Sequence, residues 1–143
     1  MRTRTPPATP VPVSTPSDSA AEPRGCTNLR VRQLMRRLDT HYDQELAKAG
    51  LKTTQYSLLS HIVKLEPVAP GVLARSMKLQ ASTLTRNLQP LIAAGWVESS
   101  AGADARSRSV SSTPAGREKR QQAQRRWKQA QLAVNAALGV ERV

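Results

Sequence analysis

The chain has 143 residues, which suits one compact domain. Its 22 lysines and arginines against 10 aspartates and glutamates give a formal net charge of +12. Such a charge favours a polyanionic partner, usually nucleic acid, although a merely basic surface and a role at a membrane surface are alternatives. The single cysteine excludes a disulfide within the chain, and with only two histidines a structural zinc site is not expected. Without phenylalanine, the core must come from aliphatic side chains, which favours helices packed on helices.

Residues 1–25 are rich in Pro, Ser and Thr, a composition that predicts a disordered tail. The segment lacks the apolar stretch of a secretory signal. No apolar run elsewhere approaches the length of a membrane-spanning helix. We therefore expect a cytoplasmic protein without a membrane partner, whose folded domain covers residues 26–143.

Two amphipathic helices are predicted next. In residues 28–49, apolar side chains recur every three or four positions, which is the stripe of a helix with one apolar face. The stripe consists of Val31, Met35, Leu38, Tyr42 and Leu46. Gly50 is expected to end this helix. A second helix begins at Thr53 or Thr54 as its cap and ends at Pro67. Its predicted buried face consists of Tyr56, Leu59, Ile62 and Val63.

A helix-turn-helix is predicted between residues 70 and 93. Pro70 suits the first turn of a short helix, and a tight connection at 78–79 leads to a second helix. There, Leu84, Leu88 and Leu91 follow an i, i+4, i+7 spacing and should face the core. The opposite face then carries Ser82, Thr85, Arg86 and Gln89. Small side chains let a backbone approach DNA closely, while arginine can reach a guanine edge or a phosphate and glutamine an adenine.

Two β-prone runs, 96–102 and 108–113, flank a polar tip and predict a hairpin. A hairpin after a recognition helix is a wing, and its Arg106 and Arg108 would reach the minor groove or the flanking phosphates. A long basic helix is predicted over 114–138, with Thr113 as its cap. Its apolar side chains are expected to pack against another helix; they are Trp127, Leu132, Ala133, Ala136 and Ala137.

This order of elements resembles the multiple-antibiotic-resistance regulator (MarR) family of bacterial transcription factors over about residues 26–143. The stretch "DARSRSVSSTPAG" is similar to the family's wing motif. Its matching positions are Asp104, Arg106, Arg108, Val110, Thr113 and Gly116, while Ser112 stands where leucine is usual. The stretch "LARSMKLQASTLTRNLQPLIAAGWVE" resembles the recognition segment. Its matching positions are Leu73, Ala74, Leu79, Ser82, Thr83, Thr85, Arg86, Leu88, Leu91 and Gly95, and Gln80 replaces the usual serine cap.

The resemblance implies a mainly α-helical fold with a small β-hairpin wing, that is, a winged helix-turn-helix. The helices at 28–49 and 114–138 would form the dimer, and residues 53–113 the DNA-binding lobe. The contacts to DNA would come from Ser82, Thr83, Thr85, Arg86, Gln89, Arg106 and Arg108. The partner would be double-stranded DNA with a palindromic operator, bound by a homodimer that acts most often as a repressor and is released by a small ligand or by oxidation.

Two other functions are weighed against this one. The alternative is a shortened partner-binding module that heterodimerises with a full-length relative, because relatives carry a further dimerising helix about where this sequence ends. An enzyme is the rival from another class. The sequence shows no nucleophile elbow, phosphate-binding glycine loop, metal-ligand cluster or paired carboxylates at the spacing of one helix face. We therefore expect no enzyme, no cofactor and no metal site.

Two kinds of inducing signal are considered. Some relatives that sense organic hydroperoxides use a lone cysteine near the position of Cys26, helped by tyrosines, and neighbouring arginines and a helix N-terminus would favour its thiolate. The other signal is a small aromatic carboxylate bound between the dimerising helices and the lobe, with Arg37 as a carboxylate partner. The candidates for that site are Arg37, His41, Tyr42, Tyr56 and His61. The alternatives are a spare cysteine, core tyrosines and surface histidines.

Overall fold

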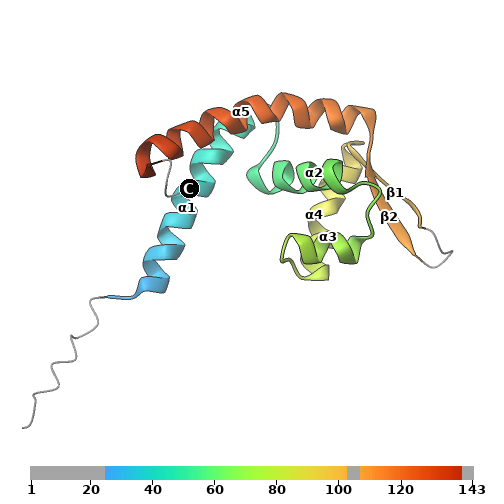
Figure 1. Cartoon of the computed structure of the whole chain (residues 1–143), viewed down its shortest axis with the longest axis horizontal. Helices are drawn as coiled ribbons and strands as arrows, with labels where there is room; N and C mark the ends of the chain where they lie inside the picture. The colour runs from blue at the N-terminus through green and yellow to red at the C-terminus, as the bar shows by residue number, and fades with distance from the viewer. Residues whose placement is uncertain (1–24, 103–106, 140–143) are drawn as a thin grey trace, which may run out of the picture.

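The computed structural model of the chain describes residues 25–102 and 107–139. The elements run α1 (Thr27–Ala47), α2 (Thr53–Leu65), α3 (Pro70–Ser76), α4 (Ala81–Ala93), β1 (Val97–Ala101), β2 (Arg108–Ser112) and α5 (Pro114–Leu138). Helix α5 spans the molecule, with α1 against one half and a lobe formed by α2, α3, α4 and the hairpin against the other (Figure 1). Within the described ranges, no helix is long and apolar enough to cross a bilayer.

The lobe has a core of aliphatic side chains from every one of its elements. Helix α4 contributes Leu84, Leu88 and Leu91, which are all buried as their spacing predicts. Leu58 of α2 is also buried, although the predicted face of that helix did not include it, and Val63 is only partly buried. The other buried members are Leu59, Ile62, Val68, Leu73, Ala74, Val97 and Val110. The polar side of α4 is consequently left on the surface.

The hairpin is antiparallel and pairs Val97 with Ser112 at its base and Ala101 with Arg108 toward its tip. A further segment joins its outer edge, because Val68 and Val110 exchange both backbone hydrogen bonds, at 3.0 and 2.9 Å. The hairpin extends from the end of the lobe that lies farthest from α1 (Figure 1).

Helix α1 packs on α5 only through its second half. Leu46 is its one buried residue, within a small cluster that also contains Leu51, Tyr56 and Ala123. The predicted stripe continues toward the N-terminus, but Val31 and Met35 are about half exposed. On α5 the buried side chains near α1 are Ala130 and Val134, whereas Leu132, Ala133, Ala136 and Ala137 are exposed.

The helix ends agree with the predicted caps at some places and differ at others. Thr113 caps α5 as predicted, since its Oγ1 accepts a hydrogen bond from the Gly116 N–H at 3.0 Å. Helix α2 begins at Thr53 itself, with Lys52 as the capping residue, so neither threonine is the cap. The reason is that Asp43 of α1 accepts hydrogen bonds from both the backbone N–H and the hydroxyl of Thr53, at 2.6 Å each. A neighbouring helix thus satisfies one of the N–H groups at the start of α2 that have no partner within the helix.

Candidate nucleic-acid interface

The exposed face of α4 is polar and carries one cation. Ser82, Thr85, Arg86 and Gln89 are all exposed, while Thr83 is half-buried at the edge of the face. The Thr85 hydroxyl donates to the carbonyl of Ala81 at 3.0 Å, so its oxygen remains available as an acceptor. Among the residues that the structure describes, none forms a hydrogen bond or ion pair with the Arg86 side chain. An unpaired guanidinium on a face of small side chains is suited to a guanine edge or a phosphate.

The turn between α3 and α4 places this face at the surface of the lobe. Lys78 adopts φ of +53°, a conformation more often taken by glycine. The Leu79 N–H then bonds back to the carbonyl of Ala74 at 2.9 Å. Gln80 precedes α4 without making a side-chain cap, so the start of this helix lacks the hydrogen bond that a serine there would supply.

The wing adds a second unpaired cation. Arg108 is exposed at the start of β2, and its side chain has no hydrogen-bond or ion-pair partner within the described ranges. Asp104 and Arg106 lie outside the described residues, so the predicted role of Arg106 stays a prediction. Guanidinium groups at the end of a hairpin are suited to phosphates or to a narrow minor groove.

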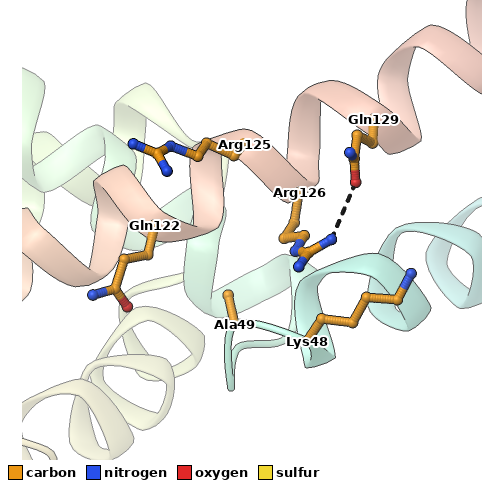
Figure 2. Close-up of a pocket in the computed structure, with 6 residues that line it drawn as sticks. All are labelled: Lys48, Ala49, Gln122, Arg125, Arg126 and Gln129. Atoms are coloured by element: carbon orange, nitrogen blue, oxygen red, sulfur yellow. Dashed lines mark hydrogen bonds between the residues drawn. The ribbon is translucent and has the colours of Figure 1, made fainter.

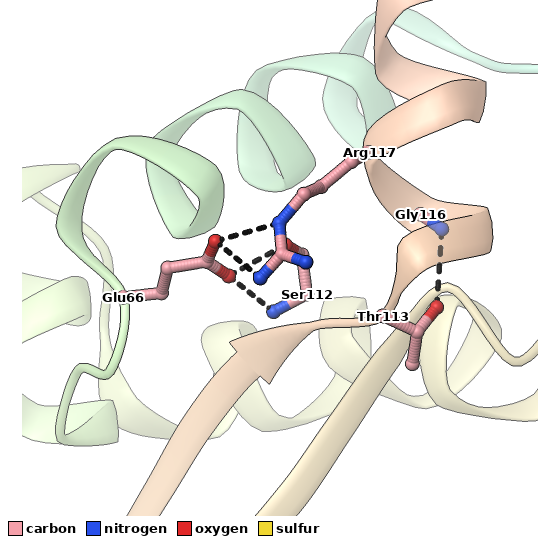
Figure 3. Close-up of polar contacts among 5 residues, drawn as sticks. All are labelled: Glu66, Ser112, Thr113, Gly116 and Arg117. Carbon is pink, nitrogen blue, oxygen red and sulfur yellow. Dashed lines mark hydrogen bonds and ion pairs between the residues drawn. The ribbon is translucent and has the colours of Figure 1, made fainter.

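The base of the wing is tied to α2 and α5 by one carboxylate. Glu66 Oε2 accepts hydrogen bonds from the backbone N–H of Ser112 at 2.6 Å and from its hydroxyl at 2.5 Å. Glu66 Oε1 accepts from Nε and Nη2 of Arg117, at 3.1 and 2.9 Å (Figure 3). Burial of the carboxylate raises the pKa of Glu66, but the hydrogen bonds from Ser112 and Arg117 and the charge of Arg117 outweigh it and hold the pKa below its usual value.

The comparisons with known proteins agree with this geometry. A family model described as the MarR family matches residues 49–107. MosR from M. tuberculosis, solved in complex with DNA, is 35% identical over 80% of this chain and 84% of that chain, with a TM-score of 0.73. The chain belongs to the MarR family.

Two more distant MarR-family structures share the fold, a mutant MarR from E. coli complexed with operator DNA and the repressor CouR bound to a 23-mer duplex. For the MarR mutant the identity is 19%, the coverage 80% of this chain and 84% of that one, and the TM-score 0.73. For CouR the identity is 16%, the coverage 81% of this chain and 83% of that one, and the TM-score 0.75.

A search of curated protein sequences found no match. The family and the fold make this chain a MarR-type winged-helix regulator that binds DNA, as its resemblance implied. Within the described lobe, α4 is the recognition helix of this fold and the hairpin is its wing.

Three of the five predicted ligand residues meet in one hollow beneath α5. Tyr42, Tyr56 and His61 line a space of about 390 Å³ together with Ser60, Arg120 and Trp127. The ring of Tyr56 stacks on Trp127 with 6.2 Å between centroids. The side chains of this hollow therefore come from α1, α2 and α5, where α1 and α5 meet the lobe.

Among the residues that the structure describes, two that line this hollow each have a buried polar atom without a hydrogen-bond partner. The atoms are Oγ of Ser60 and Nε of Arg120, and both residues also border an adjacent hollow of about 450 Å³ together with His61, Val63 and Lys64. By contrast, the hydroxyl of Tyr42 donates to Gln131 Oε1 at 2.7 Å, and burial raises the pKa of Tyr42. His61 Nδ1 donates to the carbonyl of Ser57 at 2.8 Å. Because buried polar groups are nearly always hydrogen-bonded, the two unpaired atoms mark where a polar ligand or water would bind.

The remaining predicted ligand and redox residues lie elsewhere. Arg37 borders a shallow hollow on α1 with Gln33, Arg36 and Thr40. His41 Nε2 donates to the Ala130 carbonyl at 3.1 Å, outside the hollow beneath α5. Cys26 is exposed at the start of α1. Tyr42 lies 16 positions along the same helix, or about 24 Å at 1.5 Å per residue, so within one chain this tyrosine does not assist the cysteine.

Another hollow, also of about 390 Å³, lies between α5 and the end of α1 and is lined by none of the predicted site residues. It is bordered by Lys48, Ala49, Gln122, Arg125, Arg126 and Gln129. Figure 2 shows that Arg126 points toward Lys48 and Ala49 and bonds Gln129, whereas Arg125 projects from a different side of α5. Lys48 is paired with Glu45. The cations of this hollow do not converge, so it forms no evident anion site.

The sequence patterns did not single out Glu66 or Arg120 as candidate site residues. Arg120 is one of several basic residues in the helix predicted over 114–138, and Glu66 precedes Pro67, which was used only to mark the end of the second helix. A signal was present for Glu66, because Ser112 replaces the leucine of the family's wing motif. A small polar residue at a buried strand position requires a hydrogen-bond partner.

Proposed function

We propose that this chain is a cytoplasmic repressor that binds a palindromic operator as a homodimer and is released by a small aromatic carboxylate. DNA binding is supported by two exposed guanidinium groups that have no partner among the described residues. They belong to Arg86 on α4 and Arg108 on the wing. They lie on the two elements that a winged helix presents to DNA. The complexes of MosR and CouR with DNA support the assignment.

The homodimer is supported by apolar surface on α1 and α5. Six large apolar side chains on these helices are 41–67% exposed; they are Leu29, Val31, Leu34, Met35, Leu132 and Leu138. Burying half of each side chain in a dimer interface would contribute on the order of 1 kcal/mol to the free energy of association. Because the first half of α1 stands apart from the rest of the chain (Figure 1), a second copy provides a surface for it. A palindromic operator follows from the two-fold symmetry of such a dimer.

The carboxylate ligand is supported by the hollow beneath α5. Tyr56 and Trp127 offer aromatic faces, and the unpaired Nε of Arg120 and Oγ of Ser60 offer donors. A guanidinium that lacks a partner gains most from a carboxylate, with which it forms charge-assisted hydrogen bonds. This hollow lies between α5 and the lobe, so a bound ligand would change the angle of the lobe and hence the spacing of the two recognition helices in the dimer.

The experiment is a competition titration at near-physiological salt, with DNA from upstream of the chain's own gene and a scrambled duplex of equal length. Salt is needed because a net charge of +12 binds any DNA at low ionic strength. We expect at least about a hundredfold preference for the upstream DNA. Equal, weak binding to both duplexes would contradict operator recognition. A chain that sediments as a monomer would contradict the homodimer and favour the heterodimerising module.

The ligand is tested on the same complex with salicylate. Salicylate should release the wild-type protein from DNA, and Arg120→Ala should require at least about tenfold more of it, the size of one lost charge-assisted contact. Arg125→Ala removes an exposed arginine of the same helix and serves as the control. If both variants respond like the wild type, the hollow is not the ligand site. Oxidation is the competing signal; release by cumene hydroperoxide that Cys26→Ser abolishes would favour it.

A further inference from the structure

We propose that Glu66 is a positioning residue for DNA binding, because its carboxylate fixes the base of the wing and thereby sets where Arg108 lies. This inference rests on the proposed function, since the placement of the wing affects affinity only if the lobe binds DNA. Glu66 itself lies at the end of α2 and belongs to neither DNA-facing element.

The Glu66 carboxylate extends the hydrogen bonding along the outer edge of β2 to a position where backbone groups do not pair. Val68 pairs with Val110, so the next hydrogen-bonded pair of an antiparallel ladder would be Glu66 with Ser112. Backbone pairing does not continue there, because the chain enters α2 and the Glu66 N–H already donates to the Ile62 carbonyl at 2.8 Å. The Glu66 side chain instead receives the Ser112 N–H at 2.6 Å. One side chain thus supplies the last link between the 66–68 segment and β2.

The same carboxylate also fixes the start of α5. Its second oxygen receives both Nε and Nη2 of Arg117 (Figure 3). Four donors therefore converge on a carboxylate whose side chain is 16% exposed. Charge-assisted bonds of this kind are short and directional, so they hold the ends of α2 and β2 and the start of α5 in one arrangement.

The contacts of Glu66 with Ser112 and Arg117 lie at the base of the wing, so a small change in angle there displaces the residues nearer its tip. Ser112 is at the base of β2 and Arg108 is four residues away, or about 13 Å at 3.3 Å per residue. A tilt of about 10° at the base would move Arg108 by about 2 Å, which exceeds the tolerance of a hydrogen bond to phosphate. Loss of the Glu66 contacts should therefore weaken the Arg108 contact and leave the face of α4 unchanged.

A double-mutant cycle tests this claim. Glu66→Gln should weaken binding to upstream DNA about threefold to tenfold, as expected for part of one charge-assisted contact. In the Arg108→Ala background the same substitution should have almost no further effect, whereas in the Arg86→Ala background its full effect should remain. An equal loss in all three backgrounds would overturn the positioning role.

Amide hydrogen exchange without DNA gives an independent readout. Glu66→Gln should speed exchange in β2 and leave α4 unchanged, while Glu98→Gln, at an exposed position on β1, should alter neither. Unchanged protection of β2 would overturn the proposal. If Glu66→Gln does not fold, Ser112→Ala removes only the hydroxyl donor and should give the same pattern with smaller amplitude. A wild-type protein that binds no duplex refutes the proposed function, while the exchange data still decide whether Glu66 holds the wing.

Discussion

Gly116 lies directly against the backbone carbonyl of Trp96. A Cβ atom built at Gly116 would lie 1.9 Å from that oxygen and 2.8 Å from its carbon. The same junction is bonded by Thr113, whose N–H donates to the Trp96 carbonyl at 3.0 Å and whose hydroxyl donates to that of Gly95 at 2.6 Å. The first turn of α5 is therefore pressed onto the segment that connects α4 to the wing.

We expect Gly116→Ala to destabilise the fold by at least about 2 kcal/mol, because backbone and not a flexible side chain must move to admit the methyl group. Urea unfolding measures the change. Gly71→Ala is the control, since its Cβ would meet only the end of the Arg75 side chain at 3.7 Å. Alanine there should be neutral or should stabilise α3 by up to about 1 kcal/mol. Equal stability of the Gly116 variant and the wild type would contradict the close approach.

The start of the recognition helix can be improved. Gln80 makes no side-chain cap, so Gln80→Ser should stabilise the protein by about 1 kcal/mol by bonding a free N–H of the first turn. Gln80→Ala should change the stability little, because there is no cap to remove. Thermal or urea unfolding distinguishes the two variants, and a destabilising serine would show that the residue has another role.

Arg86 is expected to recognise the DNA sequence by contacting the edge of a base. Arg86→Ala should reduce binding to upstream DNA more than to a scrambled duplex, because a contact to a base edge is worth about 1–3 kcal/mol of discrimination. Arg125→Ala removes the same charge from α5 and should leave the ratio of the two affinities unchanged. A parallel loss on both duplexes for Arg86→Ala would mean that this side chain contacts only phosphates.

Arg108 is expected to contact the DNA backbone. Arg108→Ala should weaken binding to both duplexes and reduce the slope of log affinity against log salt by about one unit, since one fewer counterion is released. The control is Arg36→Ala, at an exposed position on α1. An unchanged slope for Arg108→Ala would place the arginine away from the phosphates.

Because of Glu66, the free energy of unfolding should change with pH in the acid range. Because its pKa is lowered in the folded state, its contribution is present above the ordinary glutamate pKa, about 4.3, and is lost as the pH falls through the folded value. The stability difference between wild type and Glu66→Gln should therefore be largest near neutral pH and shrink below about pH 4. Urea unfolding from pH 7 to pH 3 measures it, with Glu98→Gln as the control. A difference that does not vary with pH would contradict a stabilised carboxylate.

Local patterns predicted most of the fold. The spacing of Leu84, Leu88 and Leu91 placed the polar face of α4 on the surface, and Thr113 with Pro114 marked the start of α5. These features depend on residues within one helical turn of each other, so a sequence shows them directly.

Contacts between distant residues were not predictable in this way. Glu66 lies 46 positions from Ser112 and 51 from Arg117, and no periodicity relates them. The basic residues of α5 show the same limit. The prediction was only of a long basic helix, yet Arg117 binds Glu66, and Lys119 donates to the Ala49 carbonyl at 2.9 Å and lies 5.1 Å from the Trp96 ring centre. Only packing decides which cations stay free.

The candidate site was predicted unevenly for the same reason. Arg86 and Arg108 follow from the motif and are free in the described structure, whereas Arg37, predicted to meet a carboxylate, lies apart from the hollow that contains Arg120. A helix predicted from sequence alone does not show which of its arginines a neighbouring helix will cover. The direct contacts to DNA remain predictions for each residue.

A footprint of the purified protein on DNA upstream of its own gene tests the central claim most directly. Two winged-helix lobes related by a two-fold axis should protect one pseudo-palindromic site of about 20 base pairs, with half-sites about 10 base pairs apart. This protection should occur at protein concentrations that leave a scrambled duplex fully accessible. Uniform protection that begins at the same concentration on both DNAs would show that the positive charge, and not a pair of recognition helices, determines where the protein binds.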